Sequence, residues 1–586
     1  MEHQEKNSDD AIKKGAEGSR DPKRPWLESY PPNVPDTITV EPFENLSDRL
    51  DKICAQFAGH KAFTSFEHSV TYARFERMVK KLAAFLQADL GLRKGQTLAI
   101  IMPNLIQYPV SVFAALKCGL RVVNINPLYT AREITGILQS CDASCVIALN
   151  TVGRRLEDVS RVMPLKHVII TGAGDLLGPF KGPLVNFASI YISRLVDHYF
   201  LRKAISFKSA LSKGDPSLFT PVDLKGSDIA FLQYTGGTTG KPKGAMLSHS
   251  NLIANVRQCL AMYGSELKMG QETILTPLPL YHVFSMTVNL MLQVTIGANS
   301  ILVVDPRRFG LFLKTVKRHP EISIMTGVNT LFAAMVDHGV FTSKYPMKHL
   351  RLAIGGGAAV QSGVAERFFK ASGQHILEGY GLTECSPVAC VNPYTARVFT
   401  GSIGIPLPST LARIVSLDDG HEIWDLGVAG ELEFKGPQVM TGYYRNEAEN
   451  AHVRDDGWLR TGDIAVWQQG GYLKIVDRIK DMIIVSGFNV FPSEIEDVVS
   501  HMPKVRECCA VGVPSEKSGE AVKLFVVKRD PSLSEEEVRV YCRTFLTGYK
   551  RPKIISFVKA LPKSPVGKVM RRYLQDPQYL KDHQNG

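Results

Sequence analysis

The sequence predicts an α/β fold with a large N-terminal domain of layered α/β sheets, a small β-rich subdomain and a small α+β C-terminal domain. Short apolar, β-branched runs alternate with amphipathic runs such as 75–90, which is typical of parallel strands covered by helices. From residue 401 onward, short strands punctuated by Gly and Pro indicate the β-rich part. The apolar runs lie at 98–103, 121–126, 144–149, 167–172 and 323–328.

The chain of 586 residues is too long for one hydrophobic core, so we expect several domains. Its first residues are polar and mixed in charge, which excludes a secretory signal and predicts a flexible tail. The predicted boundaries are a tail over 1–40, an N-terminal domain over 41–477 with its β-rich subdomain at about 401–477, a charged joint over 478–482, a C-terminal domain over 483–575 and a tail over 576–586.

Composition excludes several classes of protein. Apolar residues make up 44% and charged residues 22%, which indicates a folded globular chain. The most apolar stretch, 283–304, contains Asn289, Gln293 and Asn299, so we expect a buried helix and a core strand rather than a membrane span. Ten scattered cysteines without a CxxC pair predict reduced core thiols in a cytoplasmic protein.

Basic residues are unevenly distributed in a chain of formal net charge +12. Between 541 and 575 there are nine Lys or Arg and no acid, which attracts anions such as nucleotides, coenzyme A or anionic lipid. No zinc-finger or RNA-recognition motif accompanies them, so we expect no nucleic acid partner. Between 181 and 213 six basic residues face one acid beside a run of helically spaced apolar residues. This run fits peripheral contact with an anionic membrane, and equally a helix packed on the protein's own core.

The segment 234–244 (YTGGTTGKPKG) follows an apolar run and predicts a polyphosphate-binding loop. Its small residues let backbone N–H groups approach phosphates, its hydroxyls add donors and its lysines add positive charge. It is not a Walker loop, because Thr235 stands at the first Gly position and Pro242 follows the lysine. The candidate binding residues are Tyr234, Thr235, Gly236, Gly237, Thr238, Thr239, Gly240, Lys241 and Lys243.

Further motifs follow in a fixed order: 279–282 (PLYH), 355–358 (GGGA), 379–384 (GYGLTE), 458–463 (WLRTGD), 477–478 (DR) and 562–568 (PKSPVGK). Together with the phosphate loop they resemble the adenylate-forming (AMP-binding) superfamily of acyl-CoA synthetases, peptide-synthetase adenylation domains and luciferases. The resemblance covers about 25–572 and is strongest to the bacterial long-chain fatty acyl-CoA synthetases, in phrases such as EGYGLTECSP and DMIIVSGFNVFPSEIEDVV.

The resemblance implies ATP, Mg²⁺ and coenzyme A as cofactor or substrate, and it assigns roles to residues. Lys568, Glu384 and His282 would be catalytic, and Thr235 and Glu384 would bind the metal, as hard oxygen ligands suit Mg²⁺. Tyr380 would cover the adenine and Asp463 and Arg478 would bind the ribose. The nucleotide-binding set outside the phosphate loop is Gly355, Gly356, Gly357, Ala358, Gly379, Tyr380, Gly381, Thr383, Asp463 and Arg478.

The resemblance also implies a mobile C-terminal domain that rotates about Lys480 between two half-reactions. Val328 and Met286 would line the acyl pocket. Some long-chain relatives carry a gating Trp where this chain has Met286, so a tunnel gate of that design is not expected here.

The function implied is ATP-dependent activation of long-chain fatty acids to acyl-CoA through acyl-AMP, for degradation or lipid synthesis. The alternatives are a fatty acyl-AMP ligase that loads a carrier protein, a synthetase for another carboxylic acid, and a catalytically silent ATP-binding protein; the intact Lys568, Glu384 and Asp463 oppose silence. We expect a cytoplasmic enzyme, peripheral on the cytoplasmic face of the inner membrane, and the resemblance implies a homodimer.

Overall fold

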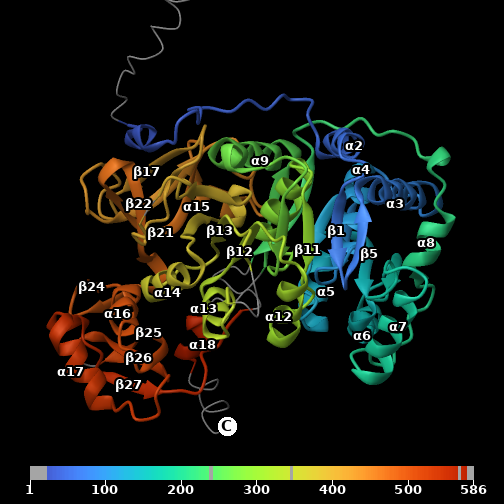
Figure 1. The fold of residues 1–586 in the computed structure, drawn as a ribbon. Coiled ribbons are helices and arrows are strands. Elements are labelled where there is room, and N and C mark those ends of the chain that lie inside the picture. Colours follow the sequence, from blue (N-terminus) through green and yellow to red (C-terminus); the bar gives the residue numbers. More distant parts are fainter. Residues whose placement is uncertain are drawn as a thin grey trace, which may run out of the picture.

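The computed structural model describes residues 23–235, 242–342, 347–396, 398–515, 517–564 and 569–576, without the side chains of 452–455. Four sheets organise these residues (Figure 1). Two large sheets with their helices form the N-terminal domain, a third forms the β-rich subdomain and the fourth belongs to the C-terminal domain. The predicted α/β class with a small β-rich part and a small C-terminal domain is confirmed.

The first large sheet has seven strands, parallel except for β9 at its edge. In order across the sheet they are β7 (Ile205–Ser206), β6 (His167–Thr171), β5 (Ala143–Leu149), β3 (Thr97–Ile101), β4 (Arg121–Asn124), β8 (Ile229–Thr235) and β9 (Lys243–Ser248). Strand β3 is buried at every position, as expected for a parallel strand covered on both faces. The helices between residues 72 and 213 are α3 (Tyr72–Ala84), α4 (Gln107–Lys117), α5 (Ala131–Ser140), α6 (Gly153–Val162), α7 (Lys181–Phe187) and α8 (Phe207–Lys213).

The second large sheet has nine strands, and its six central strands run parallel. In order they are β16 (Ile405–Pro406), β15 (Val388–Val391), β14 (Ile376–Gly381), β13 (Leu352–Gly355), β12 (Ile324–Gly327), β10 (Thr273–Thr276), β11 (Asn299–Leu302), β1 (Lys61–Ser65) and β2 (His68–Thr71). Further helices of this domain are α2 (Leu46–Gln56), α9 (His249–Tyr263), α12 (Phe309–Arg318), α13 (Asn329–Asp337) and α14 (Ser362–Ser372). Functional loops are expected at the carboxyl ends of such parallel strands.

The β-rich subdomain is an antiparallel sheet of six strands. They are β18 (Glu422–Ile423), β17 (Leu411–Val415), β19 (Gly430–Lys435), β21 (Trp458–Gln468), β20 (Arg454–Asp455) and β22 (Tyr472–Arg478), with α15 (Glu447–Val453) between β19 and β20. The subdomain begins later than the predicted residue 401, because β16 at 405–406 still pairs with β15 of the nine-stranded sheet.

The C-terminal domain has its own apolar core, built on strands that pair only with one another among the described residues. Its strands are β23 (Ile483–Val485), β24 (Phe488–Val490), β25 (Val505–Ser515), β26 (Gly519–Lys528) and β27 (Ile554–Phe557), and its helices are α16 (Pro492–Ser500), α17 (Glu535–Phe545) and α18 (Arg571–Gln575). A single 3₁₀ turn, Ile479–Asp481, separates β22 from β23. The change of sheet therefore falls inside the predicted joint.

The predicted tail over 1–40 is partly wrong, because residues 23–40 pack on the β-rich subdomain and cross the top of the molecule in Figure 1. Trp26 is 1% exposed and stacks on Trp467 with ring centroids 5.8 Å apart. Tyr30 donates a hydrogen bond to Pro406 O at 2.9 Å. The polar composition of this segment predicted a flexible tail, but the burial of a single Trp side chain is enough to hold residues 23–40 against the subdomain.

The apolar stretch 283–304 is a buried helix followed by strand β11, as predicted. No helix among the described residues is long and apolar enough to cross a bilayer. All ten cysteines are free and buried, so they lie in the core as predicted.

Candidate active site

A cavity of about 640 Å³ opens where the two large sheets, the β-rich subdomain and the joint meet. The carboxyl ends of β13 and β14 form its floor through Gly356, Gly357 and the motif 379–384. Residues 459–463 of β21 and 478–480 of the joint line another side. Segments more than 200 residues apart in the sequence thus contribute to one space, as the resemblance implied.

Glycines of both glycine-rich turns lie so close to neighbouring backbone that a side chain would not fit without a shift. A Cβ on Gly356 would lie 3.1 Å from Gly379 O, and one on Gly381 would lie 1.8 Å from Pro387 O. Gly357 has a φ of +78°, which favours glycine. Gly355 and Ala358, also predicted as binding residues, do not line the cavity; Gly355 ends β13 against Ile376 and Val360.

Tyr380, Asp463 and Arg478 converge at one end of the cavity. Tyr380 donates a hydrogen bond of 2.6 Å to Asp463 Oδ2, and Arg478 Nε lies 2.9 Å from Asp463 Oδ1. The register of the β21–β22 hairpin places Asp463 directly opposite Arg478. Burial, and then the neighbouring Asp463 carboxylate, raise the pKa of Tyr380 far above its ordinary value, so the phenol stays a hydrogen-bond donor.

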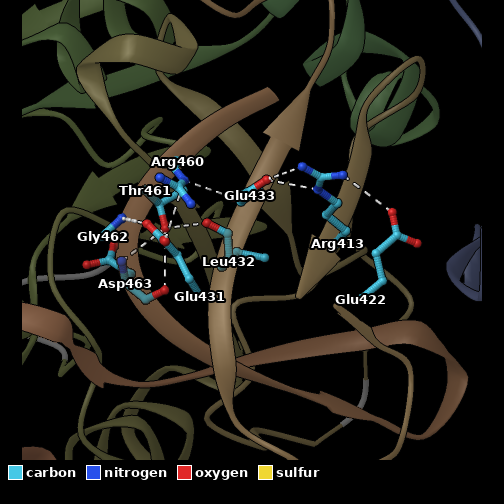
Figure 2. Close-up of polar contacts among 9 residues, drawn as sticks. All are labelled: Arg413, Glu422, Glu431, Leu432, Glu433, Arg460, Thr461, Gly462 and Asp463. Atoms are coloured by element: carbon cyan, nitrogen blue, oxygen red, sulfur yellow. Dashed lines mark hydrogen bonds and ion pairs between the residues drawn. The ribbon is translucent and has the colours of Figure 1, made fainter. Parts of the chain in front are cut away.

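A network of acids and arginines holds the loop that carries Asp463 (Figure 2). Gly462 N donates to Glu431 Oε1 at 3.1 Å, and Thr461 Oγ1 donates to Leu432 O at 2.6 Å. Burial raises the pKa of Glu431 despite the bond from Gly462 and the nearby Arg460. Behind them, Glu433 accepts from Arg413 at 2.8 Å and from Arg460 at 3.3 Å. The loop position therefore depends on β19 and β17 as well as on β21.

Three further polar residues line the same cavity, and all were predicted to contact phosphates or metal: Thr235, Lys243 and Glu384. Glu384 accepts a hydrogen bond of 2.5 Å from Tyr443, and Lys243 forms an ion pair with Glu449. Lys243 is only 9% exposed.

Tyr443 and Glu449 come from the loop and helix α15 after β19, and both line the cavity. Sequence reasoning missed them, and no local signal marks Glu449, which lies 206 residues from its partner.

The rest of the predicted phosphate loop, Gly236, Gly237, Thr238, Thr239, Gly240 and Lys241, lies outside the described residues, as does Lys568. Tyr234 is described but does not line the cavity; its hydroxyl lies 2.6 Å from Ser140 Oγ. Thr383 does line it.

The remaining wall is apolar and leads away from His282, which caps the helix beginning at Val283. Met286 and Val328, predicted to line the acyl pocket, are not among the lining residues. Met286 is fully buried and its sulfur accepts from Asn124 Nδ2 at 3.5 Å. The apolar lining residues include Cys259, Tyr263, Val283, Phe284, Val288, Leu292, Val388 and Val391.

Lys480, the predicted hinge residue, also lines the cavity. Burial, and then the neighbouring Arg478, lower its pKa. Both sides of the joint are tied to the C-terminal domain: Asp477 accepts from Ser493 N at 2.9 Å, and Arg571 lies 3.3 Å from Asp481 and 2.7 Å from Glu496.

Comparison with known proteins matches residues 50–444 to the AMP-binding enzyme family and residues 494–568 to the AMP-binding enzyme C-terminal domain. A protein named long-chain-fatty-acid–CoA ligase from Escherichia coli O157:H7 is 48% identical over 94% of this chain and 98% of its own length. One of the same name from Bacillus subtilis strain 168 is 35% identical over 96% and 99%. The crystal structure of ATP-bound MatB from Rhodopseudomonas palustris, 25% identical, superposes with a TM-score of 0.78 over 92% of this chain and 99% of that one.

Proposed function

The chain belongs to the AMP-binding enzyme family, and we propose that it is an AMP-forming long-chain fatty acid:CoA ligase. One observation carries the proposal: an apolar wall and the polar cluster of Tyr380, Asp463 and Arg478 belong to the same cavity. An alkyl chain needs the first and a nucleotide needs the second. The names of the curated relatives support a long-chain fatty acid as the substrate.

The proposed reaction has two steps. A carboxylate oxygen of the fatty acid attacks the α-phosphorus of ATP, and the bond to the β-phosphate oxygen breaks, releasing pyrophosphate. The thiolate of coenzyme A, its proton lost to solvent, then attacks the acyl carbon, and AMP leaves with the electrons of the acyl C–O bond. The first step joins two anions, so the protein contributes mainly positioning and neutralisation of charge.

We assign the nucleoside end to Tyr380, Asp463 and Arg478. Asp463 can accept hydrogen bonds from ribose hydroxyls while Arg478 stays beside it, and Tyr380 presents its ring to the adenine. His282 lines the same cavity and caps the helix that carries the apolar residues Val283 and Phe284, so we assign it to orienting the fatty acid carboxylate.

We assign the phosphate end to Thr235, Lys243 and Glu384. Their hydroxyl, ammonium and carboxylate line the same cavity, so hard oxygen ligands for Mg²⁺ and a counter-charge for phosphates are both present. When bound, Mg²⁺ neutralises charge on the phosphate oxygens. Lys568 would add a second positive charge during the first step, and rotation about Lys480 would withdraw it for the second.

The test incubates the protein with ATP, palmitate and coenzyme A and identifies the products. AMP, pyrophosphate and palmitoyl-CoA are expected, whereas ADP and inorganic phosphate would contradict adenylation. Acyl-AMP that forms but is not transferred to coenzyme A would favour a ligase that loads a carrier protein. Activity with short or aromatic acids and none with palmitate would reassign the substrate.

We further propose peripheral docking on anionic membrane, because the segment 180–200 exposes a large apolar surface. We name its exposed large side chains, Phe180, Leu184, Phe187, Tyr191, Ile192, Leu195 and Phe200, the exposed apolar surface. These side chains are exposed to solvent, so the alternative of a helix packed on the protein's own core does not account for them. Basic residues interleave with them, which suits anionic lipid.

Co-sedimentation with vesicles of anionic phospholipid tests the docking. Changing Arg202, Lys203 and Lys208 to Glu is expected to reduce binding, and neutral vesicles should bind less than anionic ones. Unchanged binding in the triple variant would exclude this surface. The homodimer implied by the resemblance is tested separately, by light scattering of the purified protein.

A further inference from the structure

A second cavity, of about 890 Å³, lies away from the nucleoside end of the catalytic cavity. It opens at the carboxyl ends of the parallel strands β3, β4 and β5 of one large sheet and of β10 and β11 of the other. Ligands of α/β proteins bind in crevices at this edge of a parallel sheet. The cavity therefore has the location of a binding site, and nothing in the proposed reaction uses it.

The second cavity has an apolar interior and a basic margin. Leu128, Tyr281, Val303 and Phe312 contribute apolar surface. Six Lys or Arg side chains and three Asp or Glu side chains also line it. Such a surface suits an amphipathic ligand with an acidic group.

Helix α12 (Lys314, Arg318) and the turn before it (Arg307, Arg308) supply four of the six basic side chains. Arg308 precedes it and reaches Asp305 only at 4.0 Å, because Arg307 Nε already lies 2.8 Å from that carboxylate. Lys314, on the cavity side of α12, has no ion pair or hydrogen bond with any described residue. Lys317 lies on the same helix but does not line the cavity. Arg308 and Lys314 are thus the cations available to an anionic ligand.

The exposed apolar surface and the cavity share one segment. Val185, Ala188 and Ser189 line the cavity, while Leu184 and Phe187 of the same turns are exposed. A chain leaving a lipid layer at this surface would meet the cavity on the other face of the same helix. The second and catalytic cavities are separated by the loop after β10, whose Tyr281 lines the former and His282 the latter.

We propose that the second cavity is a binding site for a long acyl chain ending in an acidic group, distinct from the catalytic cavity. Arg308 and Lys314 bind the acidic group, and the apolar interior holds the chain. The identity of the ligand rests on the proposed function, since a fatty acid or its CoA thioester is the acyl anion this enzyme handles.

The experiment fills the catalytic cavity first, with a palmitoyl-adenylate analogue whose phosphate is replaced by a non-hydrolysable sulfamate. Binding of radiolabelled palmitate, kept monomeric, is then measured by equilibrium dialysis, with unlabelled palmitate, palmitoyl-CoA or coenzyme A as competitors. We expect one further palmitate per chain. If palmitate competes and palmitoyl-CoA does not, the ligand is the free acid. If palmitoyl-CoA competes more strongly than palmitate, the ligand is the product.

Three variants test the site itself. Arg308→Glu with Lys314→Glu should weaken the second binding roughly tenfold, and Ala188→Trp, which fills the cavity, should abolish it. Lys317→Glu is the matched control and should leave it unchanged. Binding of the analogue in every variant reports an intact fold and catalytic cavity.

Absence of palmitate binding to the analogue-loaded protein would overturn the proposal. Palmitate binding in the cavity variants equal to that of the unaltered protein would also overturn it, as would displacement by free coenzyme A as strong as by palmitoyl-CoA. Failure of the analogue to bind would instead contradict the proposed function, so the two failures are distinguishable.

Discussion

The nucleoside end and the phosphate end of the catalytic cavity are built differently. At the nucleoside end, a hairpin register sets Asp463 opposite Arg478, and Tyr380 joins them from another sheet. At the phosphate end, Lys243 is paired with Glu449 and Glu384 with Tyr443. The first end is preorganised, whereas at the second end the groups proposed to bind phosphates must exchange internal partners for ATP. Substitutions of the paired residues at the two ends should therefore change the KM for ATP in opposite directions and by different factors.

The largest effect is expected from Lys568 of the C-terminal domain, which lies outside the described residues and belongs to neither of the two ends compared above. Lys568→Ala should slow acyl-AMP formation by ~10²–10³-fold, the scale of removing one preorganised charge donor. Conversion of supplied acyl-AMP to acyl-CoA should survive, because that step uses the rotated domain. Single-turnover assays of each half-reaction measure both. Equal loss in both would indicate a structural role instead.

At the nucleoside end, Asp463→Asn should raise the KM for ATP by roughly 10–100-fold, since charge-assisted hydrogen bonds contribute about 1.5–3 kcal/mol. The amide keeps the shape but loses the charge beside Arg478. Asp456→Asn, at an exposed turn of the same subdomain, is the matched control and should leave KM unchanged. An unaltered KM in Asp463→Asn would show that this end does not bind the nucleotide.

Stability near the nucleoside end should depend on pH through Glu378, between the two glycine turns. Burial raises its pKa to about 7, although Val360 N donates a hydrogen bond to its carboxylate. The folded state holds this proton more tightly than the unfolded chain, so its stabilising contribution is present below pH 4.5 and is lost as pH rises towards 7.

Glu378→Gln removes that titration and keeps an acceptor for Val360. Thermal unfolding should show the variant more stable by up to about 3 kcal/mol at pH 8, and by less than about 1 kcal/mol at pH 5. The same difference at both pH values would exclude the titration of Glu378 as the cause.

The smallest expected effect is a lower KM for ATP. Glu449→Gln weakens the internal partner of Lys243, so the KM for ATP should fall by about 2–5-fold, in line with the 0.2–1 kcal/mol of a partly exposed ion pair. Glu447→Gln, exposed in the same helix, should change nothing. A rise in KM would mean that Glu449 supports the bound state and that the comparison of the two ends is mistaken.

The structure brings together the three residues that the sequence grouped at the nucleoside end, because each stands in a short motif whose strands also determine its geometry; their binding roles stay predictions. Tyr443 and Glu449 could not be found that way, since their contacts with Glu384 and Lys243 depend on how α15 packs. Met286 was carried over from the position of a gating Trp in long-chain relatives. Here it is buried beside Asn124, whereas Val288, two residues further along the same π-helix, lines the cavity.

Isotope exchange between pyrophosphate and ATP tests the central claim, activation through acyl-AMP, most directly. With palmitate present and coenzyme A absent, labelled pyrophosphate should enter ATP, because the first step is reversible and needs no thiol. Exchange should cease without palmitate. Exchange at the same rate with and without palmitate would contradict the account. So would a lack of exchange in a protein that still makes palmitoyl-CoA.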